Sequence, residues 1–161
     1  NVNSLSHSDV SVWRDLSPSS LAPAVLTGKA IYSHRRHALN FRTNRPSSYE
    51  VPTGFANFTS GISVEFRASF GRQVNNWERI IDFGIGTNNA NIFWGRNALT
   101  NTLSFDLVSA VGTDLGFCSV ANGILNNEEA NYVITIDGTN CKVYRNGNLI
   151  STQAYARHLM A

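Results

Sequence analysis

The stretch ISVEFRASF, residues 62–70, alternates apolar and polar side chains without interruption. Apolar residues occupy every even position from Ile62 to Phe70, and Ser, Glu and Arg occupy the odd positions between them. Because successive side chains of a strand point to opposite faces, this pattern predicts a β-strand with one buried and one solvated face.

Further strand-like segments follow at short intervals, separated by Gly- and Asn-rich turns. Asp137-Gly138 and Asn146-Gly147 are typical of hairpin turns, since glycine accepts positive φ at little cost. No stretch shows convincing 3.6-residue periodicity. The sequence therefore predicts an all-β fold, an antiparallel two-sheet sandwich of the jelly-roll type. The additional strand candidates are 47–52, 78–86, 91–96, 102–109, 115–120, 131–138 and 140–150.

The organisation of the chain is predicted to be simple. Residues 1–30 carry the weakest pattern, with Ser-Pro and Ala-Pro steps that disfavour helix, and they predict an irregular lead-in packed on the domain. Residues 31–161 are predicted to form the sandwich. A chain of 161 residues with 42% hydrophobic side chains is long enough to bury one sizeable core.

The charge and hydropathy exclude some function classes. A net charge of +2 is too small to indicate nucleic-acid binding. No run of about 18 apolar residues is present, so no membrane insertion is expected. The basic residues are nearly all Arg, with Lys only at Lys29 and Lys142. Arginine suits planar, bidentate contacts, but solvated surface positions are the preferred interpretation for these side chains.

The two cysteines, Cys118 and Cys141, leave two alternatives open. A disulfide would close a loop of roughly 24 residues and stabilise the fold by about 3 kcal/mol. Free, buried thiols are slightly preferred on sequence alone. Neither cysteine belongs to a spacing typical of a zinc site.

Several segments also resemble a known family in their order and spacing. The most specific is NYVITIDGTNCKVYRNGNLI, residues 131–150, in which one strand ends in Asp-Gly and the next reads Val-Tyr-x-Asn-Gly before an apolar pair. With the segments below, it resembles the laminin-G-like domains of the concanavalin A-like lectin/glucanase superfamily. The supporting segments are VSVWRDLS (10–17), ALNF (38–41), SSYEVP (47–52), FTSGISVEFRASF (58–70) and WERIIDFGIGTNNANIFWGR (77–96).

The sequence departs from the family pattern in two places. Many relatives carry acidic residues just after the ALNF position, where this chain has Arg42 and Arg45. Relatives also continue for several strands past the Asn-Gly turn, whereas this sequence ends at Ala161. The resemblance therefore implies that the last strands are missing and are supplied by further chain, by a homo- or hetero-oligomeric partner, or by the N-terminal segment.

The resemblance implies Ca²⁺ as a cofactor, bound at the sandwich rim by oxygen ligands. The loop GTNNAN, residues 86–91, offers Asn88, Asn89 and Asn91, and Asp114 in another loop would add charge. Asn88, Asn91 and Asp114 are the predicted metal ligands. With so few carboxylates, turn-forming asparagines without an ion are the preferred alternative.

Aromatic residues are candidates for ligand contact. Trp13, in the lead-in, is predicted to bind ligand together with Asn88, Asn89 and Asn91. Trp77 and Trp94 belong to apolar strands and are predicted to lie in the core.

One motif for covalent modification is present. Asn57-Phe58-Thr59 is an N-glycosylation sequon, so Asn57 is a predicted glycosylation site if the chain is secreted.

Catalysis is not expected. Glycosidases need two carboxylates facing each other across a sugar. Glu65 is the only acid on its strand, and Glu78 and Asp82 do not form the Glu-x-Asp-x-x-Glu string of the superfamily's glucanases. The four histidines lack a matching nucleophile signature. Residues 34–37, His-Arg-Arg-His, could bind an anion, but solvated surface is the preferred interpretation.

The sequence therefore predicts a non-catalytic recognition or adhesion module, lectin-like, that binds a glycan or an extracellular protein through rim loops. It is expected to be extracellular or at a cell or virion surface. The alternative is a structural subunit of a viral capsid or extracellular fibre that packs through the sandwich surface. A fold of this kind does not by itself determine which of the two applies.

Overall fold

The computed structural model describes residues 11–18, 22–28, 30–41, 47–52, 55, 60–72, 76–84, 91–108 and 114–154, and only the backbone of 114–117. All regular elements in these ranges are β-strands, which confirms the all-β prediction. In the same ranges, no helix is long and apolar enough to cross a membrane. The chain divides into two compact units, Asn1–Asn57 (the N-terminal unit) and Phe58–Ala161 (the C-terminal unit).

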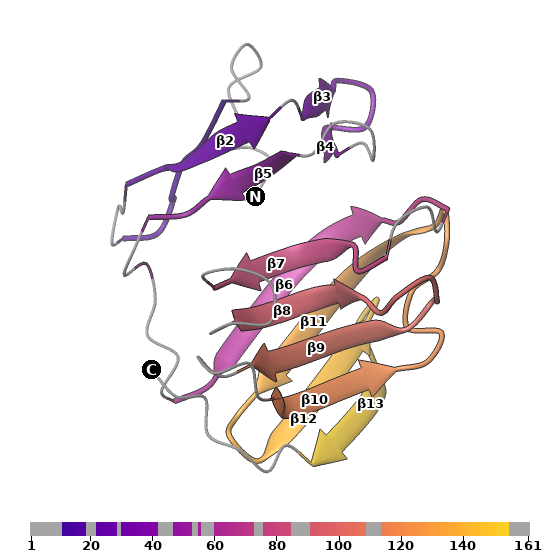
Figure 1. Ribbon diagram of the computed structural model, residues 1–161. Helices are drawn as coiled ribbons and strands as arrows, with labels where there is room; N and C mark the ends of the chain where they lie inside the picture. The colour runs from indigo at the N-terminus through magenta and orange to yellow at the C-terminus, as the bar shows by residue number, and fades with distance from the viewer. Residues whose placement is uncertain are drawn as a thin grey trace. The chain divides into compact units, whose positions relative to one another are not determined.

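The N-terminal unit contains a three-stranded antiparallel sheet of order β1-β2-β5 and a separate β3-β4 hairpin (Figure 1). Trp13 and Phe41 both place their rings edge-on to Tyr49, with centroids 5.6 and 6.3 Å from it. The strands are β1 (Val12–Trp13), β2 (Ala24–Gly28), β3 (Ile31–Ser33), β4 (Ala38–Asn40) and β5 (Ser47–Glu50).

This arrangement differs from an irregular lead-in of residues 1–30, since β1 and β2 lie within that segment. The two prolines that disfavour regular structure, Pro18 and Pro23, fall between the two strands. The division of the chain also falls later than residue 30, because β2 pairs with β5 and draws residues 47–50 into the N-terminal unit. Packing of the lead-in on the rest of the chain stays a prediction.

The C-terminal unit consists of two four-stranded antiparallel sheets that face each other (Figure 1). The strand orders are β10-β9-β8-β7 and β13-β12-β11-β6. An antiparallel two-sheet sandwich is therefore observed, while its jelly-roll connectivity stays a prediction. The strands are β6 (Ile62–Ser69), β7 (Arg79–Phe83), β8 (Asn91–Arg96), β9 (Leu103–Val108), β10 (Asp114–Val120), β11 (Glu129–Ile136), β12 (Asn140–Arg145) and β13 (Asn148–Ala154).

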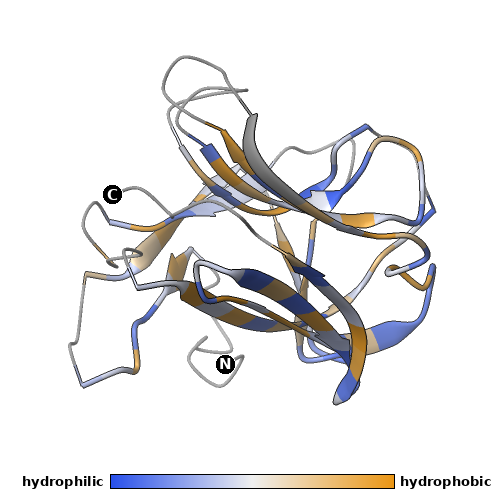
Figure 2. Cartoon of the chain, turned by 90° about the horizontal axis from the view of Figure 1, so that it is seen from below, coloured by the Kyte–Doolittle hydropathy of each residue, from blue (hydrophilic) through white to orange (hydrophobic). Residues whose placement is uncertain are grey.

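Strand β6 is the stretch ISVEFRAS, and its side chains alternate between half-buried and exposed as predicted. Apolar and polar colours alternate along the strands in Figure 2, as a sheet with one face in a core requires. On β6, Phe66 packs edge-on against Trp94 of the opposite sheet, with ring centroids 4.5 Å apart, and stacks on Tyr132 of β11 at 5.2 Å. Trp94 is 1% exposed and Tyr132 is fully buried, so these rings lie in the core between the two sheets.

The Asn146-Gly147 turn between β12 and β13 confirms the predicted hairpin. Both residues have positive φ, 51° and 79°, as a two-residue turn that matches the strand twist requires.

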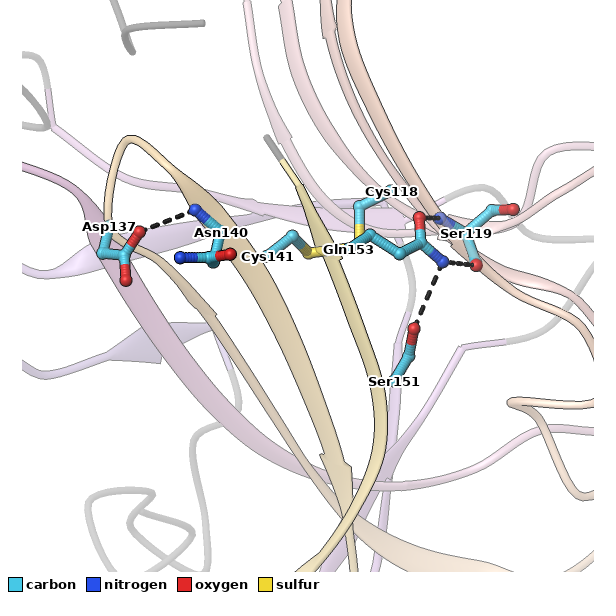
Figure 3. Close-up of a disulfide and its surroundings, with 7 residues drawn as sticks. All are labelled: Cys118, Ser119, Asp137, Asn140, Cys141, Ser151 and Gln153. Carbon is cyan, nitrogen blue, oxygen red and sulfur yellow. Dashed lines mark hydrogen bonds between the residues drawn. A yellow bond between two sulfur atoms is a disulfide. The ribbon is translucent and has the colours of Figure 1, made fainter. Parts of the chain in front are cut away.

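One side of the sandwich is closed by a disulfide and an amide (Figure 3). Cys118 of β10 and Cys141 of β12 are bonded across the two sheets, with Cα atoms 6.3 Å apart. Beside them, the Gln153 side chain accepts a hydrogen bond from the Ser119 backbone N–H at 3.1 Å and donates one to the Ser119 carbonyl. The sequence preference for free thiols is thus corrected. β10 is an edge strand, and the Gln153 side chain bonds the backbone N–H and carbonyl of Ser119 that a neighbouring strand would otherwise bond.

We expect the disulfide to stabilise the fold by about 3 kcal/mol, since it joins positions 23 residues apart and restricts the unfolded chain. Urea unfolding should show a lower midpoint for the wild type in reductant than without it. The double variant Cys118→Ala/Cys141→Ala is the matched control, and reductant should leave its midpoint unchanged. Equal midpoints for reduced and oxidised wild type would contradict the assignment.

The hairpin between β11 and β12 is capped by Asp137. Its carboxylate Oδ1 accepts hydrogen bonds from the backbone N–H of Asn140 at 2.7 Å, the backbone N–H of Thr139 at 3.0 Å and the Thr139 hydroxyl at 2.8 Å. These donors, that of Asn140 foremost, favour the charged carboxylate and lower its pKa from 3.8 to about 2.

A carboxyl with a lowered pKa in the folded state stabilises it above the unfolded pKa, and this contribution is lost as the pH falls through the folded pKa. We therefore expect the stability advantage of the wild type over Asp137→Asn to shrink from about pH 4 to about pH 2. Urea unfolding of both proteins across this range measures the difference. A constant difference would show that the native turn does not depend on the charge of Asp137.

Candidate functional site

The structure brings two of the predicted calcium ligands into one row of a sheet. Asn91, at the start of β8, and Asp114, at the start of β10, are both register partners of Val108 on the strand between them. Their backbones are thus two strand spacings apart, about 10 Å. The other two predicted rim residues, Asn88 and Asn89, lie outside the described residues, as do Asn57 and the rest of its sequon.

Of the predicted calcium ligands, Asn91 is the one whose side chain the structure describes. Asn91 is only 3% exposed, and calcium ligands must place oxygens 2.3–2.6 Å from the ion. Among the described residues, no group of three or more His, Cys, Asp or Glu side chains could hold a metal ion. Calcium binding by Asn88, Asn91 and Asp114 stays a prediction.

The three tryptophans differ sharply in exposure. Trp94 is buried in the core, as predicted. Trp77 is 44% exposed, so its predicted place in the core is wrong. It lies in the turn before β7 rather than within the strand, so the strand pairing that partly buries Ile80 and Ile81 does not include it. Trp13, the predicted ligand contact in β1, is 42% exposed in the N-terminal unit.

Trp77 has an unusual backbone conformation. Its φ is 58°, in the left-handed region that bulky side chains rarely occupy. Such strain persists only where the surroundings impose it, and it is found most often at functional positions. Trp77 lies in the connection that leads from β6 in one sheet to β7 in the other, which places it at an end of the sandwich.

The Trp77 ring lies on a small surface made by β7 and β8. Its centroid is 5.8 Å from that of Phe93, and the two rings meet edge to face. The Arg79 guanidinium lies over the Phe93 ring at 5.2 Å and forms an ion pair with Asp82. Asp82 is the register partner of Phe93 and shares its face of the sheet. We call these four residues, Trp77, Arg79, Asp82 and Phe93, the Trp77 surface.

A glycine lets the Trp77 connection approach β8 closely. A Cβ atom on Gly95 would lie 2.0 Å from the carbonyl oxygen of Glu78 and 3.0 Å from the Cα of Arg79. A side chain at position 95 would push away Arg79, the first residue of β7, and Glu78, which precedes it. Glu78 directly follows Trp77, so Gly95 also determines where Trp77 lies. Glycine inside a strand is a known sign of such a close approach.

The connection is held at both ends by one buried arginine. The Arg96 side chain has no exposed surface, and its Nε donates to Glu78 Oε2 at 2.8 Å. Its second terminal nitrogen, Nη2, donates to the Gly71 carbonyl at 3.1 Å, and the Arg96 backbone N–H donates to the Glu78 carbonyl at 2.8 Å. Gly71 and Glu78 flank the segment that carries Trp77.

The remaining donors of Arg96 are also satisfied. Nη1 donates to the Thr100 carbonyl at 3.0 Å and to the side-chain oxygens of Asn101 and Asn126 at 3.2 Å each. Asn126 in turn donates to Asn101 Oδ1 at 2.9 Å. The guanidinium also lies 5.5 Å from the centre of the Phe70 ring. A buried cation is tolerated only when it is paired and bonded in this way.

Sequence reasoning missed this arginine, although a signal was present. Arg96 has the same parity along β8 as Ile92 and Trp94, so strand alternation points it to the buried face. The expectation that arginines are solvated fails here, because the fork of five N–H donors can be satisfied inside the protein by carbonyl and amide oxygens.

The Trp77 surface carries groups that are suited to contact with a ligand. It combines an exposed indole ring with a guanidinium and a carboxylate that already neutralise each other. These groups can stack on a flat or apolar ligand face and exchange hydrogen bonds with polar groups beside it. Comparison with protein-family models, curated proteins and solved structures finds no match for this chain, so the laminin-G resemblance rests on the sequence motifs alone.

Replacing Arg96 by Met should reduce the free energy of unfolding by about 3–5 kcal/mol, because Glu78 and two asparagines would lose a buried partner. The control is Arg67→Met, which breaks the pair with Glu129 on a side chain that is 73% exposed; its effect should stay below about 1 kcal/mol. Urea unfolding measures both. Similar, small losses for the two variants would mean that Arg96 is not a structural anchor.

Proposed function

We propose that the chain is a non-catalytic recognition or adhesion module of the laminin-G-like type, which acts at a cell or particle surface. Its ligand, a glycan or an extracellular protein, binds to the rim of the C-terminal unit at the Trp77 surface. The observation that carries the proposal is the exposed Trp77 side chain, held in a left-handed backbone conformation beside a buried anchor.

Tryptophan is one of the side chains that contribute most to binding, because it buries a large area with few rotatable bonds. A loop that is already fixed loses little conformational entropy when the ligand binds. Arg96 and Gly95 hold Glu78, the residue that follows Trp77, and the Phe93 ring supports the Trp77 indole.

The disulfide supports a location outside the reducing cytosol. Bonds such as Cys118–Cys141 form and persist in oxidising environments, which include the cell exterior.

The alternative function, a structural subunit of a capsid or fibre, is favoured by a different surface. Val133, Tyr144 and Leu149 are successive register partners across β11, β12 and β13 and lie in one row. Leu149 is 54% exposed, and Val133 and Tyr144 are partly exposed. An apolar row across a sheet face could pack against a neighbouring subunit.

A glycan array probed with and without calcium tests the recognition proposal. Wild type should bind a defined set of glycans, and Trp77→Ala should weaken binding about tenfold or more, since it removes the main aromatic contact. Leu149→Ala removes an apolar side chain on the opposite sheet that is even more exposed than Trp77, and this variant should bind as the wild type does. Both variants should fold normally.

Light scattering after size exclusion separates the two functions. A monomeric wild type, together with loss of glycan binding in the Trp77→Ala variant, supports the recognition function. An oligomer that dissociates with Leu149→Ala, together with no binding on the array in either condition, would support the structural subunit instead.

A further inference from the structure

The β3-β4 hairpin of the N-terminal unit ends in a four-residue turn of unusual composition. The turn is His34-Arg35-Arg36-His37, between Ile31–Ser33 and Ala38–Asn40. All four residues are exposed. The two arginines alone carry a formal charge equal to the net charge of the whole chain, +2.

The turn has a defined conformation. The Arg36 backbone N–H donates to the Ser33 carbonyl at 3.2 Å, which closes the turn, and His37 has a left-handed φ of 48°. This conformation directs the His37 ring back towards Tyr32, whose hydroxyl oxygen is 3.3 Å from His37 Nδ1. The His34 ring lies edge-on to the same Tyr32 ring, with centroids 5.0 Å apart.

Both histidine rings therefore contact Tyr32 at the base of the turn. Arg35 and Arg36 occupy the two central positions of the turn. Within the described ranges, no ion pair involves either arginine. The described acids of the same unit, Asp15 and Glu50, accept hydrogen bonds from Ser17 and Thr27. Arg35 and Arg36 are consecutive in the sequence, and an anion that binds both guanidinium groups offsets the repulsion between their positive charges.

We propose that the His34–His37 turn is a binding site for a tetrahedral oxyanion, a phosphate or sulfate ester group, held by the guanidinium groups of Arg35 and Arg36. Guanidinium forks match the oxygen spacing of such anions and bind them through paired, charge-assisted hydrogen bonds. The histidine rings supply further N–H donors at the edge of the turn.

The size of the site favours one anionic group over a nucleic acid strand. The four cationic or polar side chains come from a single turn. Nucleic-acid binding instead uses a basic stripe that contacts six to ten phosphates in typical cases. A single ester group on a small molecule or a saccharide fits the turn.

The test is a titration of the ¹⁵N-labelled full chain with methyl phosphate and, separately, with methyl sulfate, at constant ionic strength. We expect saturable amide shifts confined to residues 32–38. Saturation with either ester supports the proposal, and the ester with the higher affinity identifies the group. Arg35→Gln/Arg36→Gln should weaken binding about tenfold or more, since both charged forks are lost.

The control variant, Arg14→Gln/Arg72→Gln, removes two exposed arginines elsewhere and changes the net charge equally. It should bind as tightly as the wild type. The proposal fails if neither ester gives saturable shifts at the hairpin, or if the control loses as much affinity as the Arg35/Arg36 variant. The titration does not involve the Trp77 surface. Its result therefore does not decide the glycan-array test, and each proposal can fail without the other.

Discussion

One buried cation organises the end of the sandwich on which the proposed function depends. The Arg96 guanidinium reaches the oxygens of Gly71, Glu78, Thr100, Asn101 and Asn126, which belong to three separate connections. No apolar side chain could join these connections, because the carbonyl groups that face Arg96 need hydrogen-bond donors. With the charge paired to Glu78 and every partner in hydrogen-bond range, its burial is compatible with a stable fold.

The position of Trp77 follows from that anchor. An exposed indole on an unconstrained loop would sample many positions, and a ligand would have to order it. Here Arg96 binds Glu78, the residue after Trp77, Gly95 allows Glu78 to approach β8 closely, and Phe93 supports the indole ring. The packed rings of Phe66, Trp94 and Tyr132 lie in the core beneath it, so the proposed binding surface is built on strands that also form the core.

Much of the fold could be predicted from the sequence, because the pattern that indicates a strand lies within a short segment. The alternation in β6 and the Asn146-Gly147 turn depend on side-chain direction and backbone φ, both of which are properties of short segments. The exposure of Trp77 and the burial of Arg96 depend on which connections meet at one end of the sandwich, a long-range property. The bond between Cys118 and Cys141 is also long-range, since it depends on how two sheets stack.

The exchange rate of the Arg96 side-chain Nε–H with solvent tests the buried anchor most directly. In ¹⁵N spectra recorded in D₂O, this proton should persist as long as the amides of the central strand β11, because it is buried and bonded to Glu78. The Nε–H of Arg67, on an exposed side chain, should be lost at once. Exchange of the Arg96 proton as fast as that of Arg67 would contradict the account.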